Sequence, residues 1–499
     1  MSAYLGIDIG TFESKGVLVD GSGRILASAA RPHKLIVPQS GWAEHRPRED
    51  WWGDFCFLAN RLIADSGLAP AEIEAVAPSA IGPCMLPVDA DGAPLMNGIL
   101  YGVDTRAHRE IAELTARIGA DVLLARCGNA LTSQSVGPKI LWLKRNRPDL
   151  YARTAMIHTA TSYLVDQLTG ARVIDHYTAA NTSPLYLAER QEWSTELADD
   201  IIAVERLPRL AWSGEIAGHV TREAAAATGL AEGTPVTTGT IDAAAEALSV
   251  GVLAAGDMLL MYGSTIFIIE ITDERVRDGR LWYAPWLFAG QHAAMAGLAT
   301  SGTLTHWFRE QFARDLDPQT AVARLADEAA ASPPGAKGLV VLPYFSGERT
   351  PIHDPHARGM IFGLDLTHTR ADAYRALLEG IACGTRHVLE TCGEVGAGPR
   401  AIFAAGGGTR NRVWTQATSD VSGHVQIVRQ TTVGAAYGDA FLAALAVGDV
   451  RRVDIRAWNP VAREIRPDPA LRPLYDERYF TFRQLYERNR DLMRLGRKA

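Results

Sequence analysis

Cysteine is scarce in this chain, and the few residues present are scattered. Five cysteines occur among 499 residues, at positions 56, 84, 127, 383 and 392, and none stands in a Cys-x-x-Cys pair. An odd, dispersed set argues against both a disulfide framework and a structural zinc site. We therefore expect reduced thiols and a cytoplasmic protein.

Long apolar runs and basic clusters are also missing. No run of about 18 apolar residues suggests a membrane span, and Asp8 interrupts the only apolar stretch near the N-terminus, so no signal peptide is expected. The net charge of −7 is mild and lacks the basic stripe of a nucleic-acid binder. The length of 499 residues favours two large domains.

The usual nucleotide motifs do not occur. No glycine loop ends in Gly-Lys-Ser/Thr, and no Gly-x-Gly-x-x-Gly opens a helix after the first strand. The chain instead begins with an apolar strand that carries an acid, a glycine turn with a hydroxyl, and a second strand, "YLGIDIGTFESKGVLVD". A turn at residues 20–23 then continues an antiparallel meander.

This opening segment indicates a phosphate site. Asp8 lies in an apolar strand, where a carboxylate is costly unless a cation meets it. Gly10 allows the backbone to approach a ligand, and the N–H groups of Gly10 and Thr11 can point at an oxyanion. Thr11 and Lys15 add a hydroxyl and a cation. An acid for a metal ion beside phosphate donors is typical of ATP-dependent phosphoryl transfer; the alternative is a surface hairpin whose acid is solvated.

The second half of the chain begins with the same pattern. "DMLLMYGSTIFIIEIT" predicts a strand, a turn at Gly263, Ser264 and Thr265, and a second strand. Two such beginnings suggest two related domains that face each other across a cleft. We also expect a helix over residues 192–202, a small-residue helix within 431–448, and surface helices in the charged tail from about Arg451.

Eight blocks in order carry a resemblance to a known family. They include "GIDIGTFESKGVLVD", "GWAEHRPREDWW", "ILYGVDTRA", "GTIDAAAEALSVGV", "LPYFSGERTPIHDPHARGMIFGL" and "AAGGGTRNRVWTQATSDVSG". Over nearly its whole length the chain resembles the FGGY carbohydrate kinases of the actin and sugar-kinase ATPase superfamily. The resemblance implies an α/β fold of two ribonuclease-H-like domains that flank a central cleft. We expect residues 1–245 to hold the sugar and the first phosphate turn, and residues 246–499 to hold the nucleotide and a helical C-terminal tail.

The resemblance also implies roles for single residues. It makes Asp242, in "GTIDAAAEA", the catalytic base and a sugar contact; the alternative is a plain helix N-cap. Asp104 and Arg106 lie in a loop near the substrate, although a local ion pair would explain them equally well. The glycines of residues 406–408 and the neighbouring Thr409 match the adenine and ribose side of ATP, or form a flexible turn. The expected ligands are Asp8 for the metal; Gly10, Thr11, Lys15, Gly263, Ser264, Thr265, Gly302, Gly407, Gly408 and Asn411 for MgATP; and Tyr101, Asp104 and Asp242 for the sugar.

The string "LPYFSGERTP" is most similar to the xylulokinase branch, which implies an ATP- and Mg²⁺-dependent kinase for a pentulose such as xylulose. Ile81, Gly82 and Pro83 depart from that branch, which has Gln-Met-His here, and the Arg-Glu pair of glycerol kinases is missing too. A kinase for a hexulose, a tetrulose or another pentulose is therefore the first alternative. Another class is a superfamily ATPase that acts as a chaperone or filament protein, and a chaperone ATPase would continue into a peptide-binding domain. A catalytically dead sugar sensor would not need both Asp8 and Asp242. The expected partner is a small-molecule sugar, with no nucleic acid and no membrane, and a homodimer stays open.

Overall fold

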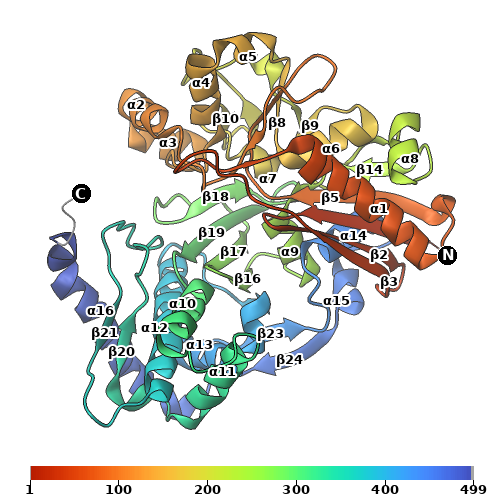
Figure 1. Cartoon of the computed structure of the whole chain (residues 1–499). Coiled ribbons are helices and arrows are strands. Elements are labelled where there is room, and N and C mark those ends of the chain that lie inside the picture. Colours follow the sequence, from red (N-terminus) through yellow and green to blue (C-terminus); the bar gives the residue numbers. More distant parts are fainter. Residues whose placement is uncertain (1, 496–499) are drawn as a thin grey trace. The chain divides into compact units, whose positions relative to one another are not determined.

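The computed structural model describes residues 2–495, which are shown in Figure 1. The chain forms two compact units, and neither is continuous in sequence. The first contains the chain up to residue 253 together with residues 273–293 and 433–459. The second contains residues 254–272 and 294–432 and the chain from residue 460 onward. The predicted boundary near residue 245 stays a prediction.

The first unit is built on one mixed sheet. Its strands are rich in Val, Ile, Leu and Ala, and β1 is buried along nearly its whole length. β1 runs antiparallel to β2 and parallel to β5, with Asp8 opposite Lys15 on one side and Ser79 on the other. The sheet order is β13-β14-β5-β1-β2-β3, and β15 also pairs with β5. The bounds are β1 (Ala3–Ile9), β2 (Glu13–Asp20), β3 (Ile25–Pro32), β5 (Ile73–Ala80), β13 (Ile216–His219), β14 (Pro235–Thr237) and β15 (Thr240–Ile241).

Two helices cover opposite faces of this sheet. Helix α1 (Gly53–Ser66) buries Phe55, Leu58 and Leu62 at helical spacing, and a Cβ at Gly16 would meet Leu62. Helix α14 (Ala435–Ala446) packs so closely that a Cβ at Gly6, on the other face, would meet its backbone. Figure 1 shows this late helix, drawn in blue, beside the red strands of the N-terminus.

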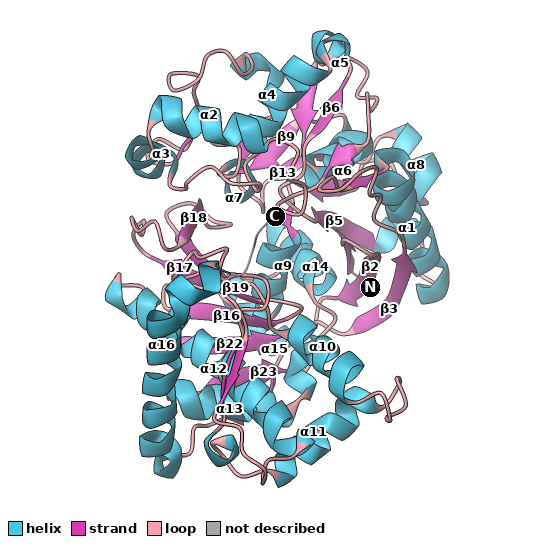
Figure 2. Cartoon of the chain, turned by 60° about the vertical axis from the view of Figure 1, so that its left-hand side comes forward, coloured by secondary structure: helices cyan, strands magenta, loops and turns pink. Residues whose placement is uncertain are grey.

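Shorter elements complete the first unit and carry its loops (Figure 2). A π-helical turn, η1 (Pro47–Trp52), leads into α1. The other helices are α2 (His108–Ile118), α3 (Ala120–Cys127), α4 (Val136–Asn146), α5 (Pro148–Arg153), α6 (Ala160–Thr169), α7 (His176–Ala179), α8 (Arg222–Thr228), α9 (Asp242–Ser249) and α15 (Ile455–Trp458). The short strands are β4 (Glu44–His45), β6 (Leu86–Val88), β7 (Gly98–Ile99), β8 (Met156–His158), β9 (Val173–Asp175), β10 (Tyr186–Leu187), β11 (Glu192–Trp193), β12 (Arg209–Ala211) and β18 (Trp282–Pro285).

The second unit repeats the plan. Its sheet runs in the order β19-β17-β16-β22-β23-β24, and the long helix α12 packs against α13 and the strand β20, which pairs with β21. The strands are β16 (Asp257–Tyr262), β17 (Ile266–Thr272), β19 (His292–Leu298), β20 (Val340–Leu342), β21 (Met360–Phe362), β22 (Ala401–Ala405), β23 (Gln426–Arg429) and β24 (Val461–Ile465). The helices are α10 (Gly302–Phe312), α11 (Ala321–Ala331), α12 (Arg370–Glu394), α13 (Arg412–Ser422) and α16 (Arg472–Arg494).

Two expectations about local structure are wrong. Residues 192–202 form the short strand β11 followed by turns, because the Ser194 hydroxyl accepts the N–H of Glu196 and competes with a helix. The charged tail contains the helix α16, but it also contributes β24, which pairs with β23 at the end of the sheet. The small-residue helix within 431–448 is confirmed as α14. None of the helices within residues 2–495 combines the length and the apolar character that a membrane crossing requires.

A buried acid in the second sheet predicts a pH-dependent stability. Glu270 in β17 is 1% exposed, and its Oε2 has no hydrogen-bond partner among the described residues. Burial raises the pKa of Glu270 from 4.5 to about 8. Between these values the folded protein keeps a proton that the unfolded chain has released, so stability falls as the pH rises from 4.5 to 8.

We therefore expect Glu270→Gln to stabilise the protein by at least about 1 kcal/mol at pH 8.5 and by much less at pH 5. Urea unfolding at both pH values measures the difference. Glu310→Gln is the matched control, because the Glu310 side chain is 60% exposed. An equal gain at both pH values would contradict the burial argument.

Candidate active site

The first phosphate turn has a shape that its sequence dictates. It joins β1 to β2, and the Gly10 N–H donates to the carbonyl of Glu13 at 3.2 Å. A Cβ at position 10 would lie 2.5 Å from that same carbonyl oxygen, so only glycine fits. The Thr11 hydroxyl lies 3.2 Å from the phenol oxygen of Tyr101. The Lys15 ammonium forms an ion pair with Glu13 at 3.3 Å, on the half-exposed surface of β2.

Asp8 belongs to a chain of hydrogen-bonding groups inside the first unit. The Ser79 hydroxyl lies 3.2 Å from Asp8 Oδ1 and 2.6 Å from Oδ2 of Asp439 on α14. Asp439 is fully buried, and its Oδ1 has no hydrogen-bond partner among the described residues. Burial and repulsion from Asp8 raise the pKa of Asp439 well above its usual range. A protonated Asp439 can donate to Ser79, which leaves the single hydroxyl proton of Ser79 for Asp8.

Asp242 is the first residue of α9 and directly follows β15. That strand is positioned by Asp175, a buried acid that accepts a hydrogen bond from the Thr240 hydroxyl at 2.9 Å. Asp242 Oδ1 accepts the N–H of the next residue, Ala243, at 2.7 Å, which occupies one oxygen only. The N-cap position belongs to Ile241, and α9 has no side-chain cap, so Asp242 does not act as a plain N-cap. Burial, and next the negative charge of Asp8, raise the pKa of Asp242 to about 8. Glu246, one turn further along α9, has a pKa raised to about 7 by burial and again by Asp8.

Asp8, Asp242, Glu246 and Asp439 are therefore acids whose negative charges repel one another. A bound cation would relieve this repulsion. Among residues 2–495 no group of three or more His, Cys, Asp and Glu side chains is arranged to hold a metal ion alone. Mg²⁺ needs no such group, because it commonly takes one or two carboxylates and completes its shell with water and substrate phosphates. Carboxylate oxygens of Asp8 and Asp242, and the Oδ1 of Asp439 that has no hydrogen-bond partner among the described residues, are ligands of the kind this ion takes.

Tyr101 and Asp104, which are predicted to bind the sugar, lie in a loop that is held by buried hydrogen bonds and ion pairs. The carboxylate of Asp104 is fully buried and accepts from the Ala43 N–H at 2.7 Å and from the guanidinium of Arg106. Arg106 also pairs with Glu44 at 2.8 Å. The ammonium of Lys139 donates to the carbonyls of Leu100 at 2.6 Å and Tyr101 at 3.0 Å. This geometry agrees with the local ion pair weighed above, and direct sugar contacts from Tyr101 and Asp104 stay predictions.

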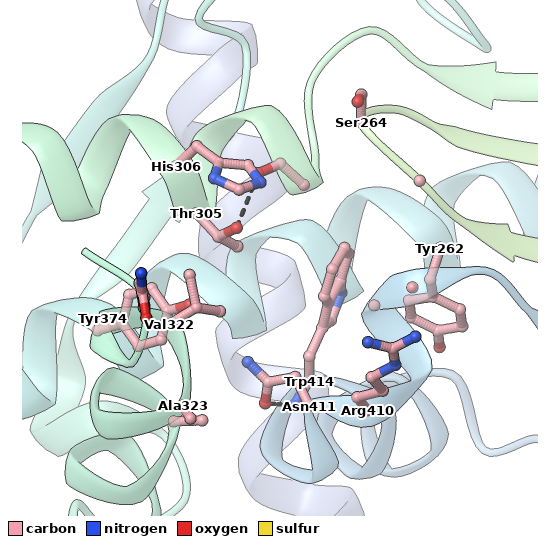
Figure 3. Close-up of a pocket in the computed structure, with 16 residues that line it drawn as sticks. Tyr262, Ser264, Thr305, His306, Val322, Ala323, Tyr374, Arg410, Asn411 and Trp414 are labelled. Atoms are coloured by element: carbon pink, nitrogen blue, oxygen red, sulfur yellow. Dashed lines mark hydrogen bonds between the residues drawn. The ribbon is translucent and has the colours of Figure 1, made fainter. Parts of the chain in front are cut away.

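A cavity of about 500 Å³ lies entirely within the second unit (Figure 3). Its volume is in the range of small-molecule sites. Segments from different parts of the second unit supply its walls, and they include six of the residues predicted to bind nucleotide. The lining residues are Tyr262, Gly263, Ser264, Gly302, Thr305, His306, Gln319, Val322, Ala323, Ala326, Tyr374, Gly407, Gly408, Arg410, Asn411 and Trp414.

Backbone contacts hold the turn at the end of β16 against the start of α10. The Gly302 N–H donates to the Gly263 carbonyl at 3.0 Å, and the Ser264 carbonyl accepts from Ser301 and Thr303 at 3.1 Å each. A Cβ at Gly302 would collide with the Gly263 carbonyl, so this approach requires glycine. The carbonyl of Thr265, beyond the cavity wall, accepts the Gly263 N–H at 3.1 Å and closes the turn.

The glycine-rich loop forms the opposite wall of the cavity. A Cβ at Gly407 would have no protein atom within 4 Å, whereas one at Gly408 would lie 2.6 Å from the ring of Trp414. Asn411 caps α13 through a 3.1 Å bond from the Trp414 N–H to its Oδ1. The open space above Gly407 is a cradle that a side chain would fill, which is the fit expected for a nucleotide. Gly406 and Thr409 serve the turn itself, since the Thr409 hydroxyl donates to the Gly406 carbonyl at 2.7 Å.

Gly407→Ala is therefore expected to fold normally and to raise the KM for MgATP roughly tenfold or more, because the new methyl group enters the cavity. Gly408→Ala is expected to destabilise the protein by about 1–3 kcal/mol through overpacking against Trp414. Steady-state kinetics and thermal unfolding separate the two effects. Gly393→Ala, at the end of α12 with no atom near its Cβ, is the control. An unchanged KM for MgATP in the Gly407 variant would mean that the nucleotide does not bind beside Gly407.

Three residues of the first unit escaped the sequence reasoning. Asp439 lies in a helix of small residues and meets Ser79 across 360 positions, so no local pattern announces it. His33 and His45 donate to carbonyl oxygens of the first phosphate turn. Only "GWAEHRPREDWW" contains one of them, and its spacing gives no hint of that contact.

Comparison with known proteins gives the family. The FGGY family of carbohydrate kinases matches in both parts, with its N-terminal domain over residues 3–249 and its C-terminal domain over residues 258–447. Xylulose kinase from Bacillus subtilis (strain 168) is 30% identical over 491 residues, which cover 96% of this chain and 97% of the relative. Gluconokinase from the same organism is 26% identical over 468 residues, with coverages of 91% and 90%.

Among solved structures, xylulose kinase from Rhodospirillum rubrum superimposes with a TM-score of 0.92 at 33% identity, over 99% of this chain and all of that one. The likeness therefore includes both sheets as well as the glycine turns. The expected α/β architecture with two sheet-containing domains is confirmed. The chain belongs to the FGGY family of carbohydrate kinases, which transfer a phosphoryl group from ATP to a sugar.

Proposed function

We propose that this kinase phosphorylates a ketose, most simply a pentulose such as xylulose, and that Asp242 is the general base. The observation that carries the second part is the position of Asp242. It stands at the end of a strand, on the first turn of a helix, with one oxygen bonded to the Ala243 N–H and the other available. A carboxylate in that position can accept the proton of an attacking hydroxyl.

The residues of the chain divide the remaining work. The Gly10 N–H is bonded to the Glu13 carbonyl, so Gly10 would let the backbone approach phosphate while the Thr11 N–H orients its oxygens, and the Gly407 loop would bind the nucleoside. Asp8, positioned by Ser79, would hold Mg²⁺ with Asp242 near it. When bound, MgATP supplies the phosphoryl group and the positive charge that favours ionised carboxylates beside it. The helix start at Asp242 acts in the same direction, because the N-terminal end of a helix favours a negative charge.

The substrate class is supported by similarity to the xylulose kinases, and one segment tests it. Ile81, Gly82 and Pro83 replace the Gln-Met-His of that branch. A Cβ at Gly82 would lie 2.7 Å from the side chain of Ile241, the residue that precedes Asp242. The altered segment therefore lies next to the proposed base, where a changed sugar contact would alter specificity. The gluconokinase described above, which is nearly as similar, illustrates how far substrates vary in this family.

A coupled assay of ADP release decides the substrate. The panel contains D-xylulose, L-xylulose, ribulose, fructose, erythrulose, gluconate, xylitol and glycerol at matched concentrations. We expect the highest kcat/KM for a pentulose and no turnover of glycerol. A clear preference for gluconate or a polyol would overturn the ketose assignment and leave the family intact.

The second candidate is a kinase for a hexulose, a tetrulose or another pentulose, and Ile81–Pro83 is the observation that favours it. Restoring the branch residues, as Ile81→Gln with Gly82→Met and Pro83→His, should then move specificity toward D-xylulose. A dimer and a cytoplasmic location stay predictions.

A further inference from the structure

The back of the first phosphate turn is held by two histidine rings. Nε2 of His33, just after β3, lies 3.0 Å from the Gly10 carbonyl oxygen. Nε2 of His45, in β4, lies 3.1 Å from the Thr11 carbonyl oxygen. The two rings meet edge to face with centroids 4.8 Å apart. Both act on carbonyl groups, so neither ring is itself a phosphate ligand in this arrangement.

A hydrogen bond from a histidine ring to a backbone carbonyl also fixes the direction of the N–H in the same peptide unit, and that N–H can donate to phosphate. The peptide unit is planar, and its C=O and the following N–H point in opposite directions. A ring bonded to the Gly10 carbonyl therefore orients the N–H of Thr11, and a ring bonded to the Thr11 carbonyl orients the N–H of Phe12. These N–H groups belong to the turn that the proposed function gives to phosphate, and aligned donors act best when they need no rearrangement.

The protonation of His45 follows from its two partners. The indole N–H of Trp51 donates to His45 Nδ1 at 3.2 Å, so Nδ1 carries no proton and Nε2–H donates to Thr11. His45 is fully buried. Burial, and next the neighbouring His33, lower the pKa of His45 to about 4. The ring is therefore a neutral donor throughout the physiological pH range.

His33 has the opposite requirement, because its two shortest contacts are with acceptors; the Ser14 hydroxyl, 3.4 Å from Nδ1, donates to Asp54. Nε2 faces the Gly10 carbonyl, and Nδ1 lies 2.8 Å from Asp54 Oδ2. Asp54, on α1, also accepts from the Ser14 hydroxyl at 2.7 Å and pairs with Arg31 at 3.1 Å. The Asp54 carboxylate is thus an acceptor already supplied with donors, and a proton on each ring nitrogen of His33 satisfies both of its contacts. The His33 side chain is 4% exposed, so water offers no substitute.

The charges around His33 maintain this state. Burial lowers the pKa of His33, but the hydrogen bond and charge of Asp54, the Gly10 carbonyl and the charge of Asp50 outweigh it, so the pKa lies above its usual 6.5. The other groups that face the pair are Arg31, bonded to Asp54, and the neutral His45. Loss of one ring proton removes either the hydrogen bond to the Gly10 carbonyl or the one to Asp54.

We propose that His33 and His45 are positioning residues that hold the donors of the Gly10–Thr11 turn toward phosphate, and that the charged pair of His33 and Asp54 makes this hold weaken at alkaline pH. This inference rests on the proposed role of the turn in phosphoryl transfer. It explains how residues that do not contact the nucleotide can affect the kcat/KM for MgATP.

Three variants test it. His33→Leu removes both donors, His33→Gln keeps an uncharged amide donor, and Asp54→Asn removes the charge that retains the ring proton. His219→Gln, at an exposed histidine of β13, is the control. Each is measured for kcat and KM with MgATP and with sugar at pH 6 to 9, and for thermal unfolding. The affinities for sugar alone and for Mg·AMP-PNP alone are measured by calorimetry.

We expect His33→Leu to lower kcat/KM for MgATP roughly 10- to 100-fold at pH 7, with sugar affinity within about twofold of the wild type. His33→Gln should recover part of this loss. The wild type should lose kcat/KM in a step above pH 6.5, the step should vanish in both His33 variants, and Asp54→Asn should move it to lower pH.

Wild-type kinetics at every pH in a folded His33→Leu protein would overturn the proposal. So would an equal loss of sugar and nucleotide affinity, which would mark a purely structural role. If His33→Leu does not fold, the shift of the pH step in Asp54→Asn decides. The Mg·AMP-PNP titration needs no sugar substrate, so an inactive sugar panel would reject the proposed function and still leave this test readable.

Discussion

Replacing Asp242 by asparagine should lower turnover by roughly 10² to 10⁴-fold and leave the protein folded. The amide keeps the shape of the side chain and the bond from the Ala243 N–H, but it cannot accept a proton from the sugar. Steady-state kinetics on the best substrate of the panel measures kcat, and calorimetry measures sugar affinity. The affinity should change far less than kcat, because the lost interaction belongs to the transition state.

Glu246→Gln is the matched control for this variant. Glu246 stands one turn further along α9 and also has a raised pKa beside Asp8, so the control removes a charge from the same cluster without removing the base. A loss of less than tenfold is expected there. If Asp242→Asn retains wild-type turnover, or if Glu246→Gln loses as much, Asp242 is not the general base.

The second large effect concerns Asp8. Asp8→Ala should weaken Mg-nucleotide binding and reduce turnover by roughly 10²-fold or more, while sugar affinity is preserved, because the acid serves the metal ion and its phosphates. Calorimetry with sugar alone and with Mg·AMP-PNP alone separates the two ligands. A titration of activity against Mg²⁺ should show a raised requirement for the ion.

Asp439→Asn provides the comparison for Asp8. A neutral amide can donate to Ser79 as the protonated acid does, so this variant should keep most of the activity. Asp439→Leu should lose more, since Ser79 then has no partner on α14. If Asp8→Ala loses sugar affinity while its nucleotide binding is unchanged, Asp8 serves the sugar and not the metal ion.

The parts of the site that the sequence predicted are those whose chemistry is local. The acid, glycine and hydroxyl of the first turn stand within four residues, so the strand-turn-strand pattern reveals them. The position of Asp242 at a strand end and helix start is also local. Gly302 and Gly407 come from separate segments, and the family resemblance, more than any spacing, predicted that both bind the nucleotide. The structure shows that both line the same cavity.

The rest depends on long-range packing. The Ser79–Asp439 contact, like the Tyr437 hydroxyl bond to the Gly23 carbonyl, joins the first strands to α14. The residues next to Asp439 in the sequence do not distinguish it from a solvated acid. Only the packing of α14 against the sheet shows that it is buried. The pairing of His33 with Asp54 requires the loop after β3 to meet α1. The strand β24 carries the adjacent charges of Arg463 and Glu464, which suit the edge of a sheet as well as they suit an exposed helix.

The return of residues 433–459 to the first unit has a consequence for biosynthesis. Helix α14 covers one face of β1 and β5, and its Gly438 lies against the backbone of α9 at Ala245. A nascent chain therefore holds its first sheet without this cover until nearly the entire second unit has been translated. The N-terminal half cannot mature first on the ribosome, and the apolar face that awaits α14 is where a chaperone would bind the growing chain.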